Sequence, residues 1–164
     1  MSVIGRLDRT DFRILTILQE NAWTSTKELA ARINLSLSAT SQRVKTLKDE
    51  GHLIAAHAVV NEKTMNMRLE ALILIQLDKH DGSVVEEFLE EIIAIPEVKS
   101  AFLITGRYDI VVNVGVCDTD HLKQLAFECF TNRPYITKIE TSLVYDSIHS
   151  RVMTPLVPRT EGKA

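Results

Sequence analysis

The chain has 164 residues, of which 45% are hydrophobic and 25% are charged, with a formal net charge of −3. This composition is ordinary for a globular protein that buries a core, as one domain or two small ones. The sequence predicts no membrane span and no secretion signal, since no apolar run approaches 18 residues and no basic start precedes an apolar stretch; the cytoplasm is the expected location.

Charge is distributed unevenly along the chain. Residues 1–60 hold eight Lys and Arg against six Asp and Glu, whereas residues 61–164 hold eleven against sixteen. This asymmetry suits a mildly basic part that reads DNA, joined to an acidic part with another role.

The spacing of the cysteines and histidines does not match that of a metal-binding site. Cys117 and Cys129 form no CxxC motif and are expected to be reduced, buried thiols. The histidines show no ligand spacing and are expected at the surface or at strand edges; they are His52, His57, His80, His121 and His149. No metal site and no cofactor is therefore predicted.

Three short amphipathic patterns follow one another near the N terminus. Asp8 is a good N-cap for a first helix, "LDRTDFRILTILQEN", and Ser25 begins an S-x-x-E capping box for a second, "STKELAARIN". Asn34 can end the second helix and Ser36 can cap a third, which Gly51 ends. The connection between the second and third helices is therefore only a few residues long.

The third helix, expected over 38–50, has an unusual outer face. Thr40, Val44 and Leu47 fall on one inward stripe, which leaves hydroxyls, an amide and cations outside. Two short helices joined by a tight turn, the second polar outside, are typical of a helix-turn-helix, whose second helix enters the DNA major groove. Phosphates favour hydroxyls and cations, and base edges favour amides and guanidinium groups. The predicted DNA-binding residues are Ser25, Ser36, Ser38, Ala39, Ser41, Gln42, Arg43, Lys45 and Thr46. From spacing alone, a solvated helix in a three-helix packing unit fits equally well.

Beyond residue 53 the hydrophobic period changes from 3.6 to 2. Residues 54–60, "IAAHAVV", are predicted to form a strand, and the polar residues 61–67 a linker. Strands and helices then alternate as βαββαβ through 68–164, with the helix at 119–132 expected to turn Leu122, Leu125, Ala126 and Cys129 inward. The predicted fold class is α+β: an N-terminal, winged-helix-like helix-turn-helix domain (1–60), and a C-terminal ferredoxin-like domain (68–164) with both helices on one face of an antiparallel sheet.

The strand at 69–77 is apolar on both faces, although two helices can cover only one. The second face is expected to meet a copy of the chain, and the resulting homodimer would match a palindromic DNA site.

With both halves considered, the chain resembles the Lrp/AsnC, or feast/famine, transcription regulators. The resemblance rests on "LDRTDFRIL" (7–15), "ELAARINLSLSATSQRVKTLKDEGHL" (28–53), "GRYDIVV" (106–112) and "ETSLV" (140–144). It implies dimers that assemble into tetramers or octamers, and a small effector, usually an amino acid, bound near the 106–109 loop. The implied effector residues are Gly106, Arg107, Tyr108, Asp109, Ile139 and Thr141.

The sequence departs from this family in the last strand. Ile139 stands where the family's T-x-T motif has its first threonine, and Tyr135-Ile136 replaces the usual Gly-Val. A pocket that lacks this hydroxyl is expected to favour an effector with an apolar body. The alternative is a degenerate pocket, in a regulator that responds to oligomer balance and not to an amino acid. On a purely structural interpretation, Gly106 is required only by the positive φ of a tight turn.

Two other functions compete with regulation. Some proteins with this pair of folds decarboxylate tetrapyrroles, and His57 and Arg107 are the residues that such an enzyme would use. A co-regulatory oligomer that binds a ligand but binds DNA weakly is the other alternative. The prediction is a non-enzymatic, nucleoid-associated DNA-binding regulator, without catalytic residues.

Overall fold

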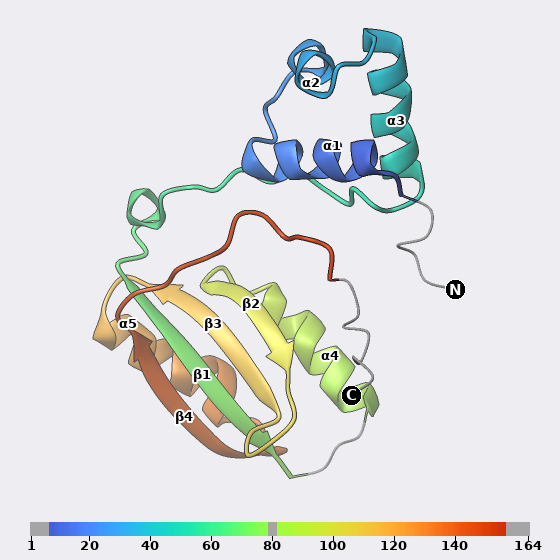
Figure 1. Ribbon diagram of the computed structural model, residues 1–164. Coiled ribbons are helices and arrows are strands. Elements are labelled where there is room, and N and C mark those ends of the chain that lie inside the picture. The colour runs from blue at the N-terminus through green and yellow to red at the C-terminus, as the bar shows by residue number, and fades with distance from the viewer. Residues whose placement is uncertain (1–6, 79–81, 157–164) are drawn as a thin grey trace, which may run out of the picture. The chain divides into compact units, whose positions relative to one another are not determined.

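The described residues form two compact units. The structure, a computed structural model, describes residues 7–78 and 82–156 (Figure 1). One unit contains the chain up to Ala58 together with the segment that begins at Ile148, and the other is Val59–Ser147. The C-terminal segment was expected in the second domain. It groups with the first because the Gln19 side-chain amide pairs with the backbone of Met153: Oε1 accepts from the Met153 N–H at 2.8 Å, and Nε2 donates to its carbonyl at 3.4 Å.

The first unit is built on the three expected helices, α1 (Arg9–Glu20), α2 (Thr26–Ile33) and α3 (Leu37–Asp49). Asp8, Ser25 and Ser36 cap their N-termini, each accepting a hydrogen bond from a backbone N–H three residues on. Asn34 ends α2 in the left-handed conformation. The turn between α2 and α3 is therefore as short as the sequence predicted.

The full capping box forms at α1 and not at α2. The Asp8 and Asp11 side chains each accept a hydrogen bond from the other residue's backbone N–H, at 2.8 and 3.0 Å. At α2 the Ser25 hydroxyl accepts from the Glu28 N–H at 3.2 Å, and no return bond from the Glu28 side chain is present among the described residues. A carboxylate at N3 satisfies the cap only when it folds back over the first turn.

One core holds the three helices together. Ile14, Leu29 and Leu47, each at most 2% exposed, meet there, and Val44 packs against them half-buried. After Gly51 the chain turns back, so that the Leu53 N–H donates to the Leu47 carbonyl at 2.9 Å and its side chain joins this core.

The strand predicted at 54–60 does not form. This segment is extended but has no ladder, and Ile54 and Val59 are 90% and 101% exposed. The prediction is wrong for the single chain because a strand needs a partner, and no described segment pairs with this one. The polar residues that follow form a 3-10 turn, η2 (Glu62–Met65).

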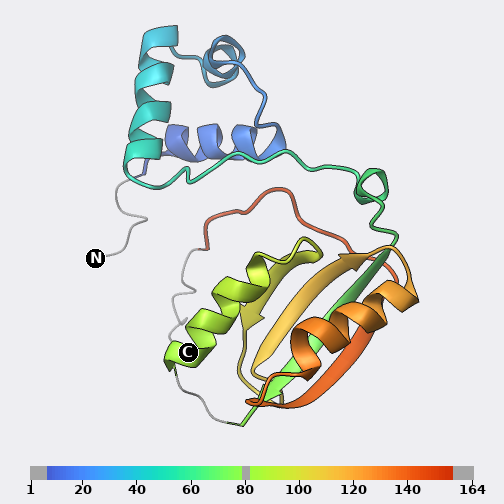
Figure 2. The same ribbon diagram turned by 180° about the vertical axis from the view of Figure 1, so that it is seen from behind.

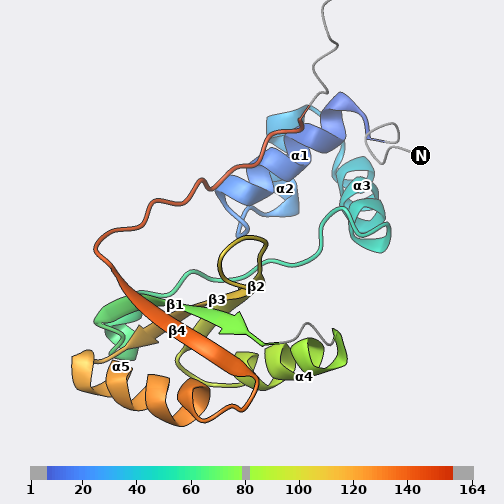
Figure 3. The same ribbon diagram turned by 90° about the horizontal axis from the view of Figure 1, so that it is seen from below.

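The second unit is the predicted ferredoxin-like βαββαβ arrangement, which confirms the α+β fold class. Its strands are β1 (Leu69–Leu77), β2 (Val98–Leu103), β3 (Ile110–Val116) and β4 (Ile136–Val144), antiparallel in the order β2-β3-β1-β4. The helices α4 (Gly82–Ile93) and α5 (Thr119–Leu125) lie on one face of the sheet, as Figures 2 and 3 show.

Strand register assigns each side chain to a face of the sheet. Ile73 and Ile75 are fully buried against the helices, whereas their neighbours Leu72 and Leu74 lie on the open face and are half-buried. Phe102 and Val111, which pair across β2 and β3, lie on that same open face. The apolar character of both faces was correctly predicted.

The helix at 119–132 changes its winding partway along. After Leu125 it continues as a π-helix, η3 (Ala126–Thr131), in which each turn takes one more residue. This change of phase turns Phe130 fully into the core and leaves Cys129 and Ala126 only half-buried. None of the helices in the described part of the chain is both long and apolar enough to cross a membrane.

Candidate functional site

An exposed row of polar side chains runs along α3. Most of the predicted DNA-binding residues lie here in solvent; we define the exposed row of α3 as Ser38, Ala39, Ser41, Gln42, Lys45 and Thr46. Among the described residues, the Gln42 and Lys45 side chains make no hydrogen bond or ion pair. These two groups are therefore available to a ligand.

Two of the serines predicted to bind DNA are N-caps of helices. Ser25 caps α2, and Ser36 caps α3, where its hydroxyl lies 3.2 Å from both the Ala39 N–H nitrogen and the Ser38 hydroxyl. Both are exposed, so each hydroxyl retains a free direction toward solvent. Their established task is to start the two helices of the motif.

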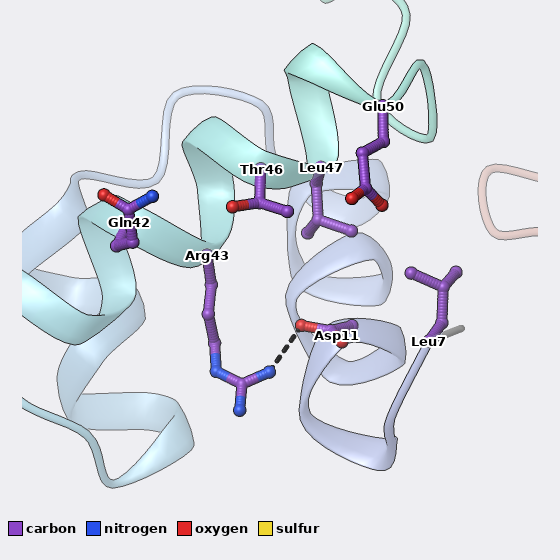
Figure 4. A pocket seen from close by; sticks show the side chains of 7 residues that line it. All are labelled: Leu7, Asp11, Gln42, Arg43, Thr46, Leu47 and Glu50. Atoms are coloured by element: carbon purple, nitrogen blue, oxygen red, sulfur yellow. Dashed lines mark hydrogen bonds and ion pairs between the residues drawn. The ribbon is translucent and has the colours of Figure 1, made fainter.

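Arg43 is held by α1. Its guanidinium donates to the Asp11 carboxylate at 2.7 Å (Figure 4). It also pairs with the Asp8 carboxylate at 2.8 Å. These carboxylates raise the pKa of Arg43, and the backbone N–H of Asp11, followed by Arg43, lowers the pKa of Asp8. The arginine predicted to contact DNA is thus already engaged in joining α3 to the start of α1.

A pocket of about 370 Å³ lies between α1 and α3 beside this ion pair. Gln42 and Thr46 project into it from α3, and Asp11 faces them from α1 (Figure 4). The Glu50 carboxylate lines it too, so the pocket has two acidic groups beside a single guanidinium. This balance does not suit a phosphate, which leaves Lys45, outside the pocket, as the better phosphate partner.

The 104–109 loop contains four of the six predicted effector residues, and the Asp109 side chain and backbone fix it to β1. The Asp109 carboxylate accepts from the Leu77 N–H at 2.7 Å, where the β1–β4 ladder shifts register, and its N–H donates to the Ile75 carbonyl at 2.9 Å. Gly106 has φ +127°, which strains any residue with a Cβ. Asp109 and Gly106 therefore shape the loop.

Tyr108 organises a charged cluster on the open face. Its hydroxyl donates to the Glu140 carboxylate, Lys138 Nζ lies 3.4 Å from that hydroxyl, and the Arg107 guanidinium lies 5.5 Å from the ring centroid. The Tyr108 hydrogen bond, followed by Lys138, lowers the pKa of Glu140. No sequence motif pointed to Lys138 and Glu140. They flank Ile139 on β4, where side chains alternate between the two faces of the sheet.

Ile139 and Thr141 lie on the face of the sheet that the helices cover, opposite to Glu140. They pair with Ile75 and Ile73, whose side chains are buried under the helices, whereas Glu140 pairs with Leu74 on the open face. Thr141 lines a pocket of about 410 Å³ beside α5 and η3. Within one chain, then, the structure does not unite the predicted effector residues: the loop residues gather near Glu140, and Ile139 and Thr141 lie on the opposite face of β4.

Residues considered for metal or enzyme chemistry do not form a catalytic or metal-binding cluster among the described residues. His121 lies 3.1 Å from Glu97 and accepts from the Cys117 N–H at 3.3 Å. Both cysteines are free and half-buried, and burial raises the pKa of Cys129. No group of three potential metal ligands occurs among the described residues, which exclude His80. His57 and Arg107, the residues of the rival enzyme interpretation, belong to different units.

Similarity to known proteins agrees with this arrangement. The family model described as winged helix-turn-helix DNA-binding matches residues 7–51, and that described as Lrp/AsnC ligand binding domain matches residues 70–153. The chain is 31% identical over 150 residues to the transcriptional regulator AzlB of Bacillus subtilis, covering 92% of this chain and 96% of AzlB. It is 28% identical to the Bkd operon transcriptional regulator of Pseudomonas aeruginosa over 153 residues, 93% of this chain and 100% of that regulator.

Solved structures show the same fold. The transcriptional regulator NMB0573 of Neisseria meningitidis, in complex with L-Met, superposes with a TM-score of 0.83 at 28% identity, over 91% of this chain and 96% of that chain. E. coli AsnC superposes with a TM-score of 0.79 at 26% identity, over 91% and 99%. A helix-turn-helix unit followed by a ligand-binding ferredoxin-like domain defines a class of DNA-binding transcription regulators. Within that class, the chain belongs to the Lrp/AsnC family.

Proposed function

We propose that this regulator binds a specific, palindromic DNA operator as a homo-oligomer and that a small effector, an amino acid, modulates this binding. The observation that carries the proposal is the exposed row of α3, in which Gln42 and Lys45 have no partner among the described residues. An amide suits a base edge and a lysine suits a phosphate. Ser25 at the start of α2, Ser36 at the start of α3 and Arg43 within α3 would add contacts to the DNA backbone.

The direct test is recovery of bound fragments from the host genome by the purified full-length protein, followed by gel shifts on the recovered sites. If the protein is a sequence-specific regulator, the recovered DNA fragments should share a sequence motif with two related halves. A co-regulatory oligomer with weak DNA binding would recover none, and absorbance changes on incubation with a tetrapyrrole would favour the rival enzyme.

Dimerisation is supported by the open face of the sheet. Leu72, Leu74 and Phe102 lie there, and Phe102 is 53% exposed. The Asn113 Oδ1 atom on this face is buried without a hydrogen-bond partner among the described atoms, which a facing chain could supply. The unpaired 54–60 segment offers a second copy a strand partner. Further assembly to tetramers or octamers remains part of the proposal.

The effector proposal is supported by the Tyr108 cluster and by the L-Met complex of the Neisseria regulator. Lys138 and Arg107 can bind a carboxylate, and Glu140 can accept from an ammonium group. The residues proposed to bind the effector are Gly106, Arg107, Tyr108, Asp109, Ile139 and Thr141; because they lie on two faces of one chain, the pocket would need a second chain to complete it. A regulator that binds chromosomal DNA in this way would work in the cytoplasm, on the nucleoid.

A thermal-shift screen of the twenty amino acids tests the effector. Apolar amino acids are expected to stabilise the protein most, because Ile139 offers no hydroxyl, and Glu140→Gln should abolish the shift. Ile139→Thr should improve binding of polar amino acids. Stabilisation of the wild type by asparagine or lysine above all others would contradict the proposal.

A further inference from the structure

A second, larger pocket lies within the first unit. Its volume is about 470 Å³, in the range of roughly 300 to 1,000 Å³ that small-molecule sites occupy. Its apolar wall comes from all three helices: Leu18 of α1, Leu29 of α2 and Val44 of α3, completed by Leu53. These side chains are buried or half-buried, so the pocket opens directly onto the core of the helix-turn-helix.

Basic groups line the same pocket from three separate segments. Lys48 comes from α3, His57 from the extended segment that leaves the helix-turn-helix, and Arg151 from the C-terminal segment. No aspartate or glutamate of residues 7–78 and 82–156 lines it. Among the described residues, none of these three side chains makes a hydrogen bond or an ion pair. Elsewhere in the unit, two arginines are paired with carboxylates: Arg32 with Glu20, and Arg43 with Asp8 and Asp11.

We propose that this pocket binds a small amphipathic carboxylate, with an aliphatic body against Leu29 and Val44 and the carboxylate between Lys48 and Arg151. An inorganic anion would leave the apolar wall unused, and a neutral apolar ligand would leave the cations unpaired. Such a ligand would contact both segments that leave the unit, near His57 and near Arg151. The site is distinct from the proposed effector loop and does not depend on it.

Octanoate is the probe, titrated into the full-length protein without DNA and followed by calorimetry. Trp23, the single tryptophan of the chain, provides an independent fluorescence signal because it stands between the pocket-lining residues Ala22 and Thr24. We expect saturable binding of one octanoate per chain. Acetate and octanol, each of which offers half of the chemistry, should bind at least about tenfold more weakly.

Charge-removing variants locate the site. Lys48→Gln and Arg151→Gln should each weaken octanoate binding by about fivefold to tenfold, since each removes one charge-assisted contact at the rim. Lys27→Gln, an exposed lysine of α2 that does not line the pocket, is the matched control and should bind like the wild type.

The proposal would be overturned by the absence of saturable binding, by equal binding of octanol and octanoate, or by an equal loss of octanoate binding in all three variants. Displacement of octanoate by the same concentration of inorganic phosphate would overturn it as well, because the cations would then be general phosphate contacts for DNA. Since no DNA is present, failure here leaves the DNA-binding proposal standing.

Discussion

Arg43 shows how a residue suited to an interface can be used inside the fold. Its position on α3 and its charge fit a DNA contact, yet two carboxylates of α1 hold it at 2.7 and 2.8 Å. The sequence could not show this, because the partners lie more than thirty residues earlier. Gln42 and Lys45, one turn apart on the same helix, have no such partners among the described residues and are left to carry recognition.

The pH dependence of stability tests the charge of Asp8, which the Asp11 backbone N–H stabilises most and Arg43 stabilises next. The pKa of Asp8 is lowered below its ordinary value of 3.8 in the folded chain, so its stabilising contribution is present above that value and is lost as the pH falls through the lowered pKa. Asp8→Asn keeps a good N-cap but removes the charge. Urea unfolding should show a destabilised variant at pH 7 whose difference from the wild type disappears in strong acid.

Asp49→Asn is the control for this experiment. Asp49 is an exposed carboxylate of α3 with no ion pair among the described residues, and its loss should leave stability nearly unchanged at both pH values. A difference for Asp8→Asn that persisted at low pH would mean that the cap, and not the charge, is responsible.

Gln42 and Lys45 should differ in what their loss does to DNA binding. Gln42→Ala should cost about 1 to 3 kcal/mol on the operator and relax specificity, as expected for an amide that contacts a base edge in two places. Lys45→Ala should weaken operator and random DNA alike and reduce the salt dependence by about one unit of slope. Gel shifts at several salt concentrations measure both effects; identical salt slopes for the wild type and Lys45→Ala would remove this lysine from phosphate binding.

At the scale of elements, local signals predicted most of the fold. Caps at Asp8, Ser25 and Ser36 and the left-handed Asn34 are short-range features, and they placed the three helices correctly. The failures have non-local causes. The strand at 54–60 lacks a partner among the described residues, and the π turn after Leu125 depends on how Phe130 packs into the core.

The predicted effector residues show the same limit of sequence-based prediction. A motif aligned along the sequence could group the 106–109 loop with Ile139 and Thr141, but β4 sends alternate side chains to opposite faces. Only the strand register revealed that Glu140, between these two residues, is the one that meets Tyr108.

Two neighbouring residues of β1 test which face of the sheet is an interface. Ile75 is fully buried under the helices, so Ile75→Lys should unfold the second unit, because an unpaired buried charge costs several kcal/mol. Leu74 faces the open side, so Leu74→Lys should remain folded but dissociate. Circular dichroism and sedimentation measure the two outcomes; a Leu74→Lys protein that stayed dimeric at micromolar concentration would exclude this face from the dimer contact.

At the scale of the whole molecule, the proposed two-fold dimer would link assembly to DNA recognition. A dimer presents two copies of α3, so the second contact with a palindrome becomes intramolecular. The wild type should therefore bind a duplex with both half-sites about 10² to 10⁴ times more tightly than one with a single half-site. Leu74→Lys should lose this advantage while keeping its affinity for a single half-site. An unchanged ratio between the two duplexes would separate DNA recognition from the proposed dimer.

The pairing of Gln19 with Met153 affects how this protein can be divided for study. Since the first unit includes the segment that begins at Ile148, residues 59–147 are topologically an insertion, and the chain passes between the units twice. A recombinant fragment that ends at residue 60 would be an incomplete DNA-binding unit, without the Met153 contact and without the Arg151 wall of its pocket. Joining residue 58 to residue 148 through a short flexible linker, with the second unit deleted, would restore the missing segment at high effective concentration and give the more faithful minimal domain.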